Sequence, residues 1–171
     1  MILTIRHYPD PVLRAPVRPV ASVTPEIRRL AADMIETMTA SDGVGLAAPQ
    51  VGESLRLVVV NFALTKDQMD PKVLVNPRLE HFAKATRVER EGCLSFPGIY
   101  GEVRRAVALD LVATDLDGAP VALHAEDYLA RVLQHEVDHL DNRLFVDRMG
   151  PAARFAAREG LAALEARFAA V

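Results

Sequence analysis

The pentad His135-Glu136-Val137-Asp138-His139 contains the residues best suited to chemistry in this chain. On an α-helix, residues four apart lie about 40° from each other around the axis, so the imidazoles of His135 and His139 can reach one divalent metal ion. Glu136 stands between them, where its carboxylate can act as a base on water at that ion. Apolar residues on both sides of the pentad favour a buried site over a chance match on a solvated helix. The pattern predicts a hydrolytic metal site.

A catalytic metal site commonly takes three protein ligands and leaves one position for water, so a third ligand must come from elsewhere. The chain after His139 contains no further histidine and offers only carboxylates: Asp141, Asp147, Glu159 and Glu165. Upstream, Cys93 stands between glycine and proline bends. A lone cysteine is more often a small buried apolar residue. Two nearby histidines would make its thiolate a suitable soft ligand for Fe(II), Co(II) or Zn(II).

Composition and charge describe a small folded protein. The 171 residues, half of them hydrophobic and 25% charged, predict one domain over residues 1–171. The formal charge of -3 gives no general attraction to nucleic acid, and direct DNA binding is not expected. No apolar run approaches the roughly 20 residues of a membrane span. The first residues do not resemble a signal peptide and a single cysteine cannot form an internal disulfide, so a cytoplasmic enzyme is expected.

The elements that must position these residues can be predicted from periodicity and turn signals. Four prolines keep the first twenty residues extended, and Thr24 then caps a helix whose apolar face runs to Met38. Residues 42–52 show neither helical nor strand period and are expected to form a shaped loop. Strands are predicted at 55–61, 73–76, 102–115 and 121–125, a helix carrying the pentad from 126 or 127 to 142, and a last helix after Pro151. The fold class is α+β, with mainly antiparallel sheets around a central helix and a C-terminal helix.

Three segments of the chain carry a resemblance to a known family. They are residues 43–50 (GVGLAAPQ), 91–95 (EGCLS) and 134–140 (QHEVDHL), in this order. Together they resemble the three signature motifs of the bacterial peptide deformylases. The resemblance extends from about His7 to Arg148, which is nearly the whole chain.

The resemblance implies that the protein removes the formyl group from the N-terminal formyl-methionine of newly made polypeptides and releases formate. The implied metal ligands are Cys93, His135 and His139. The family commonly uses Fe(II), and a thiolate with two imidazoles also accepts Ni(II), Co(II) or Zn(II). The implied partners are N-formylmethionyl peptides and nascent chains, with a transient ribosome contact through the C-terminal helix. Glu159 and Glu165 interrupt the basic residues of that helix, and this favours a solvated helix.

The resemblance also assigns catalytic roles. Glu136 accepts a proton from water and returns it to the departing amine. The side-chain amide of Gln50 and the backbone N–H of Leu94 stabilise the negative charge on the formyl oxygen. Two alternatives stay open, because a loop glutamine more often ties down a turn and Glu136 could instead hold a metal ligand in place.

Four residues are candidates for the substrate pocket. Tyr128 and Val132 precede His135 by seven and three residues, on the same helical face, so both should lie next to the metal. The first motif adds Val44 and Gly45, the latter through backbone hydrogen bonds to an extended peptide. The alternative for Tyr128 and Val132 is ordinary core packing.

Two other functions are weighed against deformylation. A zinc endopeptidase with the same helix would need a long cleft and a ligand after His139, which the sequence does not provide. A non-catalytic metal-binding relative would show a change at Glu136, Gln50 or a ligand, and all of these residues are present.

Several positions depart from the usual family pattern or have a structural interpretation. Asp127 and Asn142 replace glycines that are common at the two ends of the pentad helix, and both residues suit helix ends. Arg104 stands where proline is frequent. Asp138 is expected to have a structural role, such as an ion pair with Arg131.

Overall fold

The computed structural model describes residues 1–65 and 67–170. Its helices are α1 (Pro25–Ala40), α2 (Asp127–Leu140), α3 (Phe145–Arg148) and α4 (Pro151–Ala169), with short 3-10 turns at Pro11–Arg14 and Ala48–Val51. Its strands are β1 (Gly45–Ala47), β2 (Leu57–Asn61), β3 (Pro71–Glu80), β4 (Thr86–Gly92), β5 (Tyr100–Ala106), β6 (Ala108–Thr114) and β7 (Pro120–Glu126).

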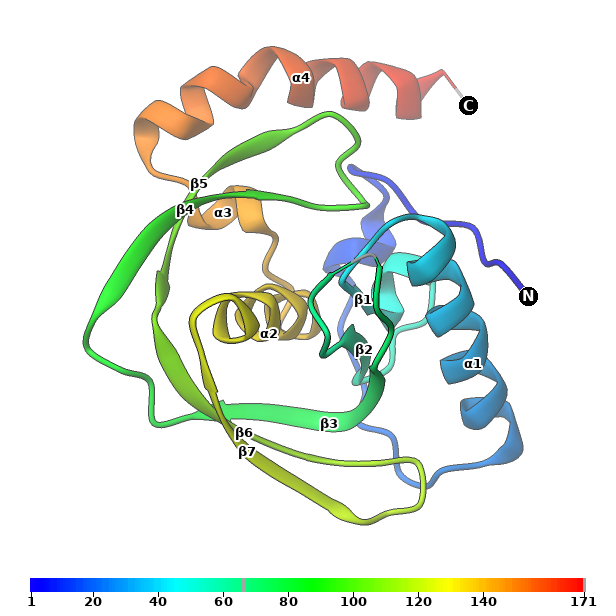
Figure 1. Cartoon of the computed structure of the whole chain (residues 1–171). Helices are drawn as coiled ribbons and strands as arrows, with labels where there is room; N and C mark the ends of the chain where they lie inside the picture. The colour runs from blue at the N-terminus through cyan, green and yellow to red at the C-terminus, as the bar shows by residue number, and fades with distance from the viewer. Residues whose placement is uncertain (66, 171) are drawn as a thin grey trace.

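All strand pairs in the two sheets are antiparallel. Five strands form one sheet in the order β1-β2-β3-β6-β7, and β4 pairs with β5 in a separate ribbon. Figure 1 shows α2 in the middle of the fold, with β3, β6 and β7 of the five-stranded sheet below it, β1 and β2 at its right, and the β4–β5 ribbon beside and above it. The predicted α+β class, with its central helix and C-terminal helix, is confirmed.

Helix α1 forms where its sequence signals predict it. The Thr24 side chain accepts a hydrogen bond from the backbone N–H of Ile27 at 3.4 Å, and Pro25 occupies the first turn. Met34 and Met38 are fully buried against apolar residues of β1 and β2. This packing fixes the chain at the start of residues 43–50.

Helix α2 is buried along most of its length, from Ala130 to Leu140. Its apolar side chains, including Leu133, join those of the five-stranded sheet in one core. Asp127 and Asn142, at its two ends, have φ angles of 48° and 58°. These are left-handed conformations that glycine adopts freely and that Asp and Asn tolerate, which explains the substitutions at both positions.

Three sequence predictions of secondary structure are corrected by the structure. Residues 102–115 were expected to form one strand, but β5 and β6 belong to different sheets and separate at Val107. Buried side chains alternate with more exposed ones on both sides of the partly buried residues 106–108, so the two strands share one alternating pattern that gives little sign of the change of partner. Residues 42–52 are not an irregular loop throughout, because they contain β1 and a 3-10 turn. Strand β3 is longer than residues 73–76 and continues past a bulge between Val75 and Arg78.

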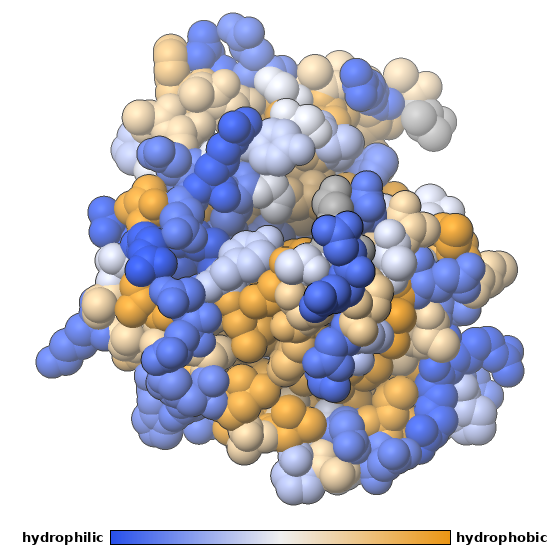
Figure 2. Space-filling model, viewed as in Figure 1, coloured by the Kyte–Doolittle hydropathy of each residue, from blue (hydrophilic) through white to orange (hydrophobic). Residues whose placement is uncertain are grey.

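Strand β4 was not predicted at all. Four of its seven residues, 86–92 (TRVEREG), are charged, three of them in a row, and such a segment is typical of an exposed surface. Figure 2 shows hydrophilic side chains gathered over the β4–β5 ribbon at the left, and apolar side chains gathered nearer the centre of the same face. Val103 of β5 is fully buried in an apolar cluster with α3 and α4, and charged side chains of the ribbon make polar contacts to α2, which are described below.

The chain ends in two helices. The short α3 was not predicted, whereas the last helix begins at Pro151 as expected. Helix α4 packs on the β5 side of the molecule through Ala157 and Leu164. Gly160 permits this approach, because a Cβ there would overlap Ile99. No helix in the described part of the chain is long and apolar enough to cross a membrane.

Candidate metal centre and active site

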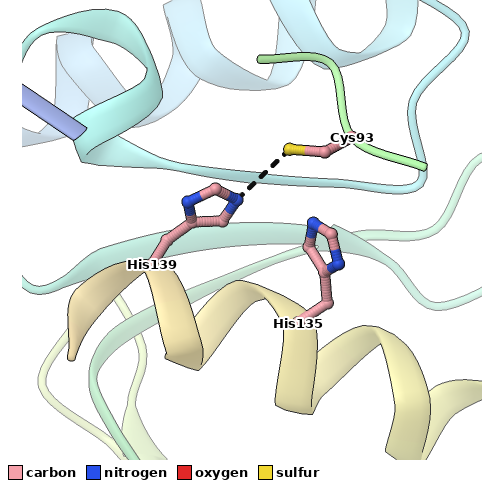
Figure 3. Close-up of side chains that lie close together, drawn as sticks. All are labelled: Cys93, His135 and His139. Atoms are coloured by element: carbon pink, nitrogen blue, oxygen red, sulfur yellow. Dashed lines mark hydrogen bonds between the residues drawn. The ribbon is translucent and has the colours of Figure 1, made fainter. Parts of the chain in front are cut away.

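Cys93, His135 and His139 meet at one point in the structure. The two histidines project from successive turns of α2, and Cys93 faces them from the turn that follows β4 (Figure 3). One donor atom from each residue lies within 4.8 Å of the others. The sulfur of Cys93 is 3.4 Å from Nε2 of His139. A sulfur and two imidazole nitrogens at this spacing are a suitable donor set for a divalent transition metal.

Burial and hydrogen bonding shift the pKa values of the two histidines in opposite directions. Burial lowers the pKa of His139 well below its ordinary value, which keeps this imidazole neutral, the form that binds metals. Burial also acts to lower the pKa of His135. Hydrogen bonds with Cys93 and Glu91 outweigh that effect and raise the pKa well above its usual range. Nδ1 of His135 is hydrogen-bonded to Oε1 of Glu91 at 2.9 Å, so Nε2 is the nitrogen left for a metal.

Glu91 is the functional residue that sequence reasoning missed. Its buried carboxylate accepts hydrogen bonds from Nε and Nη2 of Arg105, both at 3.0 Å, and from Nη1 of Arg131 at 2.6 Å. Burial acts to raise the pKa of Glu91, but hydrogen bonds from His135 and Arg105 dominate and lower it to about 2. The only available signal was its place in the second motif, two residues before Cys93.

Glu136 is buried in contact with the first motif. A Cβ on Gly45 would overlap its Oε1, so glycine is required there for the carboxylate to take this position. Oε2 is buried without a hydrogen-bond partner among residues 1–65 and 67–170. Burial raises the pKa of Glu136 to about 7. This carboxyl group can therefore change its protonation state near neutral pH.

Gln50 is held from both ends of its side-chain amide. Oε1 accepts from the backbone N–H of Ala47 at 2.9 Å, and Nε2 donates to Oγ of Ser95 at 3.2 Å. Nε2 also lies 3.4 Å from the sulfur of Cys93. Oε1 thus ties down a turn, as the alternative interpretation of Gln50 expected. Nε2, at the other end of the amide, faces the candidate metal centre. Ser95, fully buried, was not singled out from the sequence.

A cavity of about 530 Å³ opens beside these residues. All four residues predicted for the substrate pocket line it: Val44, Gly45, Tyr128 and Val132. Gln50, Leu94 and Glu136 line it as well. Val132 is 5% exposed and Tyr128 is 45% exposed, so Val132 lies at the base of the cavity and Tyr128 nearer its mouth. His139 is not among the residues that line it.

The expected ion pair between Asp138 and Arg131 is not the one that forms. Asp138 accepts hydrogen bonds from Arg105 and from Arg148, the latter at 2.7 and 3.1 Å. Arg131 instead binds Glu89 and Glu91. Arg131 therefore contacts β4, whereas Asp138 joins α2 to β5 through Arg105 and to α3 through Arg148. The structural role expected for Asp138 agrees with these contacts.

The fold and the site together define a class of protein. A buried helix carries two histidines and a glutamate, and a thiol faces the histidines from the turn after β4, which is the architecture of a metal-dependent hydrolase. The family model for polypeptide deformylase matches residues 2–155. This chain belongs to that family of metal-dependent enzymes, which remove the N-formyl group from formylated nascent peptides. Membership decides against the zinc endopeptidase and the non-catalytic relative.

Relatives of known sequence and structure agree. The peptide deformylase of Azotobacter vinelandii is 45% identical over 160 residues, which cover 94% of each chain. Peptide deformylase 2 of Gloeobacter violaceus is 45% identical over 147 residues, which cover 86% of this chain and 79% of that protein. The crystal structure of a peptide deformylase from Legionella pneumophila has a TM-score of 0.88 at 39% identity and covers 99% of this chain and 98% of that one. That of Synechococcus elongatus, in complex with actinonin, has a TM-score of 0.86 at 39% identity and covers 95% and 86%.

Proposed function

We propose that Cys93, His135 and His139 hold one divalent metal ion and that Glu136 moves the proton during deformylation. The observation that carries this proposal is the position of Glu136. Its buried carboxylate lines the cavity on the helix that carries the two histidines, with one oxygen unpaired among the described residues. A pKa of about 7 lets the same group accept and release a proton at neutral pH.

The proposed metal is Fe(II), with Ni(II), Co(II) and Zn(II) as ions that the same donors accept. When bound, such an ion supplies Lewis-acid polarisation of a carbonyl oxygen and lowers the pKa of water. The neutral His139 and the hydrogen bond that Nδ1 of His135 donates to Glu91 support this ligand set, because each prepares an imidazole nitrogen for coordination.

The proton steps follow from the position of Glu136. The ionised carboxylate takes a proton from the attacking water as the new bond to the formyl carbon forms. The carboxyl group then donates this proton to the methionine nitrogen as the C–N bond breaks, which leaves formate and a free amine. Because Glu136 sits on a buried helix and is confined by Gly45, it needs little movement between these two steps.

Charge on the formyl oxygen needs donors that are already in place. We assign this role to Nε2 of Gln50 and the backbone N–H of Leu94. Ser95 and Ala47 support the assignment of Gln50, because they fix the amide in the orientation that brings Nε2 to the cavity.

The methionine side chain is assigned to the part of the cavity formed by Val44, Tyr128 and Val132. Valine side chains and a tyrosine ring provide an apolar wall that suits a flexible thioether. Gly45, on the edge strand β1, is assigned the backbone hydrogen bonds to an extended peptide.

The assignment is tested with protein loaded anaerobically with Fe(II) and a formyl-Met peptide, by following formate. Wild type is expected to release formate. Glu136→Ala should keep its metal and lose turnover, whereas Glu102→Ala, which removes an exposed carboxylate from β5, should keep both. Cys93→Ala should lose metal. Full turnover in Glu136→Ala, or normal metal content in Cys93→Ala, would remove that residue from its assigned role.

We also propose that the enzyme works in the cytoplasm and that α4 makes a transient contact with the ribosome. Phe155 and Phe168 are exposed on this helix, and the guanidinium of Arg158 stacks on Phe155 at 3.8 Å from the ring centroid. Cosedimentation with ribosomes should fall when Phe155 and Arg158 are both replaced by Ala. Equal cosedimentation of wild type and this variant would reject the contact while leaving deformylation untouched.

A further inference from the structure

A second cavity, of about 610 Å³, lies against another face of α2. It shares no lining residue with the first cavity. Helix α2 contributes Gln134, Val137 and Asp138 to it, which lie on the side of the helix away from Val132 and Glu136, and Asp141 follows at the end of the helix. Residues of β3, β5 and α3, with Arg56 and Phe82, form the other walls. The deformylation site and the family motifs leave this cavity without an assigned role.

The second cavity is positively charged in a negatively charged protein. Five of its lining residues are arginines and three are acidic: Arg56, Arg78, Arg104, Arg105 and Arg148 against Glu80, Asp138 and Asp141. Arginines therefore outnumber acidic residues in the lining, although one of them, Arg105, is also paired with the buried Glu91 and the whole chain has a formal charge of -3. A concave basic surface of this kind attracts anions.

Two of the arginines are occupied by the protein itself. Arg105 uses Nε and both terminal nitrogens on Glu91 and Asp138. Arg56 donates to the backbone carbonyl of Pro77 and to Asp141. These two guanidiniums shape the cavity and have little capacity for another ligand.

Arg78, Arg104 and Arg148 retain donors. Within the described part of the chain, Arg104 makes one hydrogen bond, from Nη1 to Oγ1 of Thr86 at 3.1 Å. Arg78 is 3.7 Å from Glu80, too far for a hydrogen bond. Arg148 binds Asp138 through Nε and Nη2 and leaves Nη1. Each guanidinium has five N–H donors in a planar fork that matches the oxygens of a phosphate group.

We propose that this cavity binds a small oxyanion of the phosphate class, held by Arg78 and Arg104 and assisted by Arg148. The volume lies in the range of small-molecule sites. Leu79, Phe82 and Val137 line the cavity beside the arginines, while the side chains of Arg78 and Arg104 are exposed, so an anion from solution can reach them.

The probe is inorganic phosphate, titrated by calorimetry into the metal-loaded enzyme. The double variant Arg78→Gln/Arg104→Gln is expected to bind phosphate at least tenfold more weakly than wild type, with unchanged metal content, thermal unfolding and deformylation. Two exposed arginines outside the cavity, Arg28 and Arg158, provide the matched control, because Arg28→Gln/Arg158→Gln removes the same charge. This control should bind phosphate as wild type does.

Three outcomes would overturn the proposal. They are no phosphate binding by wild type at millimolar concentration, equal binding by wild type and the cavity variant, and equal weakening in the control variant, which would mean a response to net charge alone. If phosphate binds at the metal centre instead, the cavity variant will bind it as well as wild type does, and this result too would overturn the proposal. None of them bears on deformylation, because Arg78 and Arg104 lie outside the proposed active site.

Discussion

Nδ1 of His135 and Oε1 of Glu91 are 2.9 Å apart, and this contact joins the proposed metal centre to the β4–β5 ribbon. The same carboxylate binds Arg105 of β5 and Arg131 of α2. One buried group therefore orients the imidazole and fixes the strand that leads into Cys93. Metal binding and folding stability should both depend on it.

Replacement of Glu91 tests this double role. Glu91→Gln keeps the shape but leaves Arg105 and Arg131 without their shared charge, so the free energy of unfolding should fall by about 3 kcal/mol. Metal affinity should fall by about 10–100-fold, because His135 loses its orienting carboxylate. Urea unfolding and metal titration measure the two effects. Glu89→Gln is the control: Glu89 also binds Arg131 but is 42% exposed, and its loss should cost less than about 1 kcal/mol.

The low pKa of Glu91 also predicts how stability depends on pH. A folded-state pKa of about 2, below the ordinary value of 4.5, means that folding favours the ionised form. Its contribution, on the order of 3 kcal/mol, is complete above about pH 4.5 and is lost as the pH falls through about 2. Urea unfolding between pH 5 and pH 2 should show a steeper loss for wild type than for Glu91→Gln. Parallel curves for the two proteins would contradict the assignment.

The sequence predicted the donor residues of the site better than the residues that hold these donors in place. The two histidines and Glu136 follow from helical spacing alone, because four residues return the chain to nearly the same helical face. Cys93 was a candidate third ligand from the chemistry of its thiol, and the family resemblance then assigned it; the role of Gln50 required the resemblance, since a single amide has no period. Their roles remain predictions until the variants are measured.

The residues that hold the donors in place could not be predicted, because they act through contacts between distant parts of the sequence. Arg105 and Arg131 reach Glu91 from positions 14 and 40 residues away in the chain. A charged residue in an alternating strand reads as exposed, and nothing local indicates that its partner will be buried with it. For the same reason β4 was missed. Helices α1, α2 and α4, whose apolar residues and turn signals are local, were placed within one or two residues, whereas the short α3 was not predicted.

Ser95 provides a test of the orientation of Gln50. Its hydroxyl accepts from Nε2 at 3.2 Å and is fully buried, so Ser95→Ala should free that end of the amide. We expect kcat to fall about tenfold with little change in KM, because the oxyanion donor matters only as charge develops. Ser95→Thr, which keeps the hydroxyl, should recover part of the loss if the extra methyl group is accommodated. A rise in KM at constant kcat in Ser95→Ala would instead indicate a role in substrate binding.

Gly45 tests whether Glu136 must occupy its present position. An added Cβ would overlap Oε1 of Glu136, while the backbone at Gly45, within β1, has no positive φ angle and accepts alanine. Gly45→Ala should therefore fold and bind metal but displace the carboxylate, and we expect kcat/KM to fall by about 100-fold, the scale of a lost general base. Gly150→Ala is the matched control, because a Cβ there meets no atom within 4 Å, and it should retain full activity. Near-normal turnover in Gly45→Ala would show that Glu136 can move and still carry the proton. Loss of metal in that variant would show that the glycine protects the ligands and not the base.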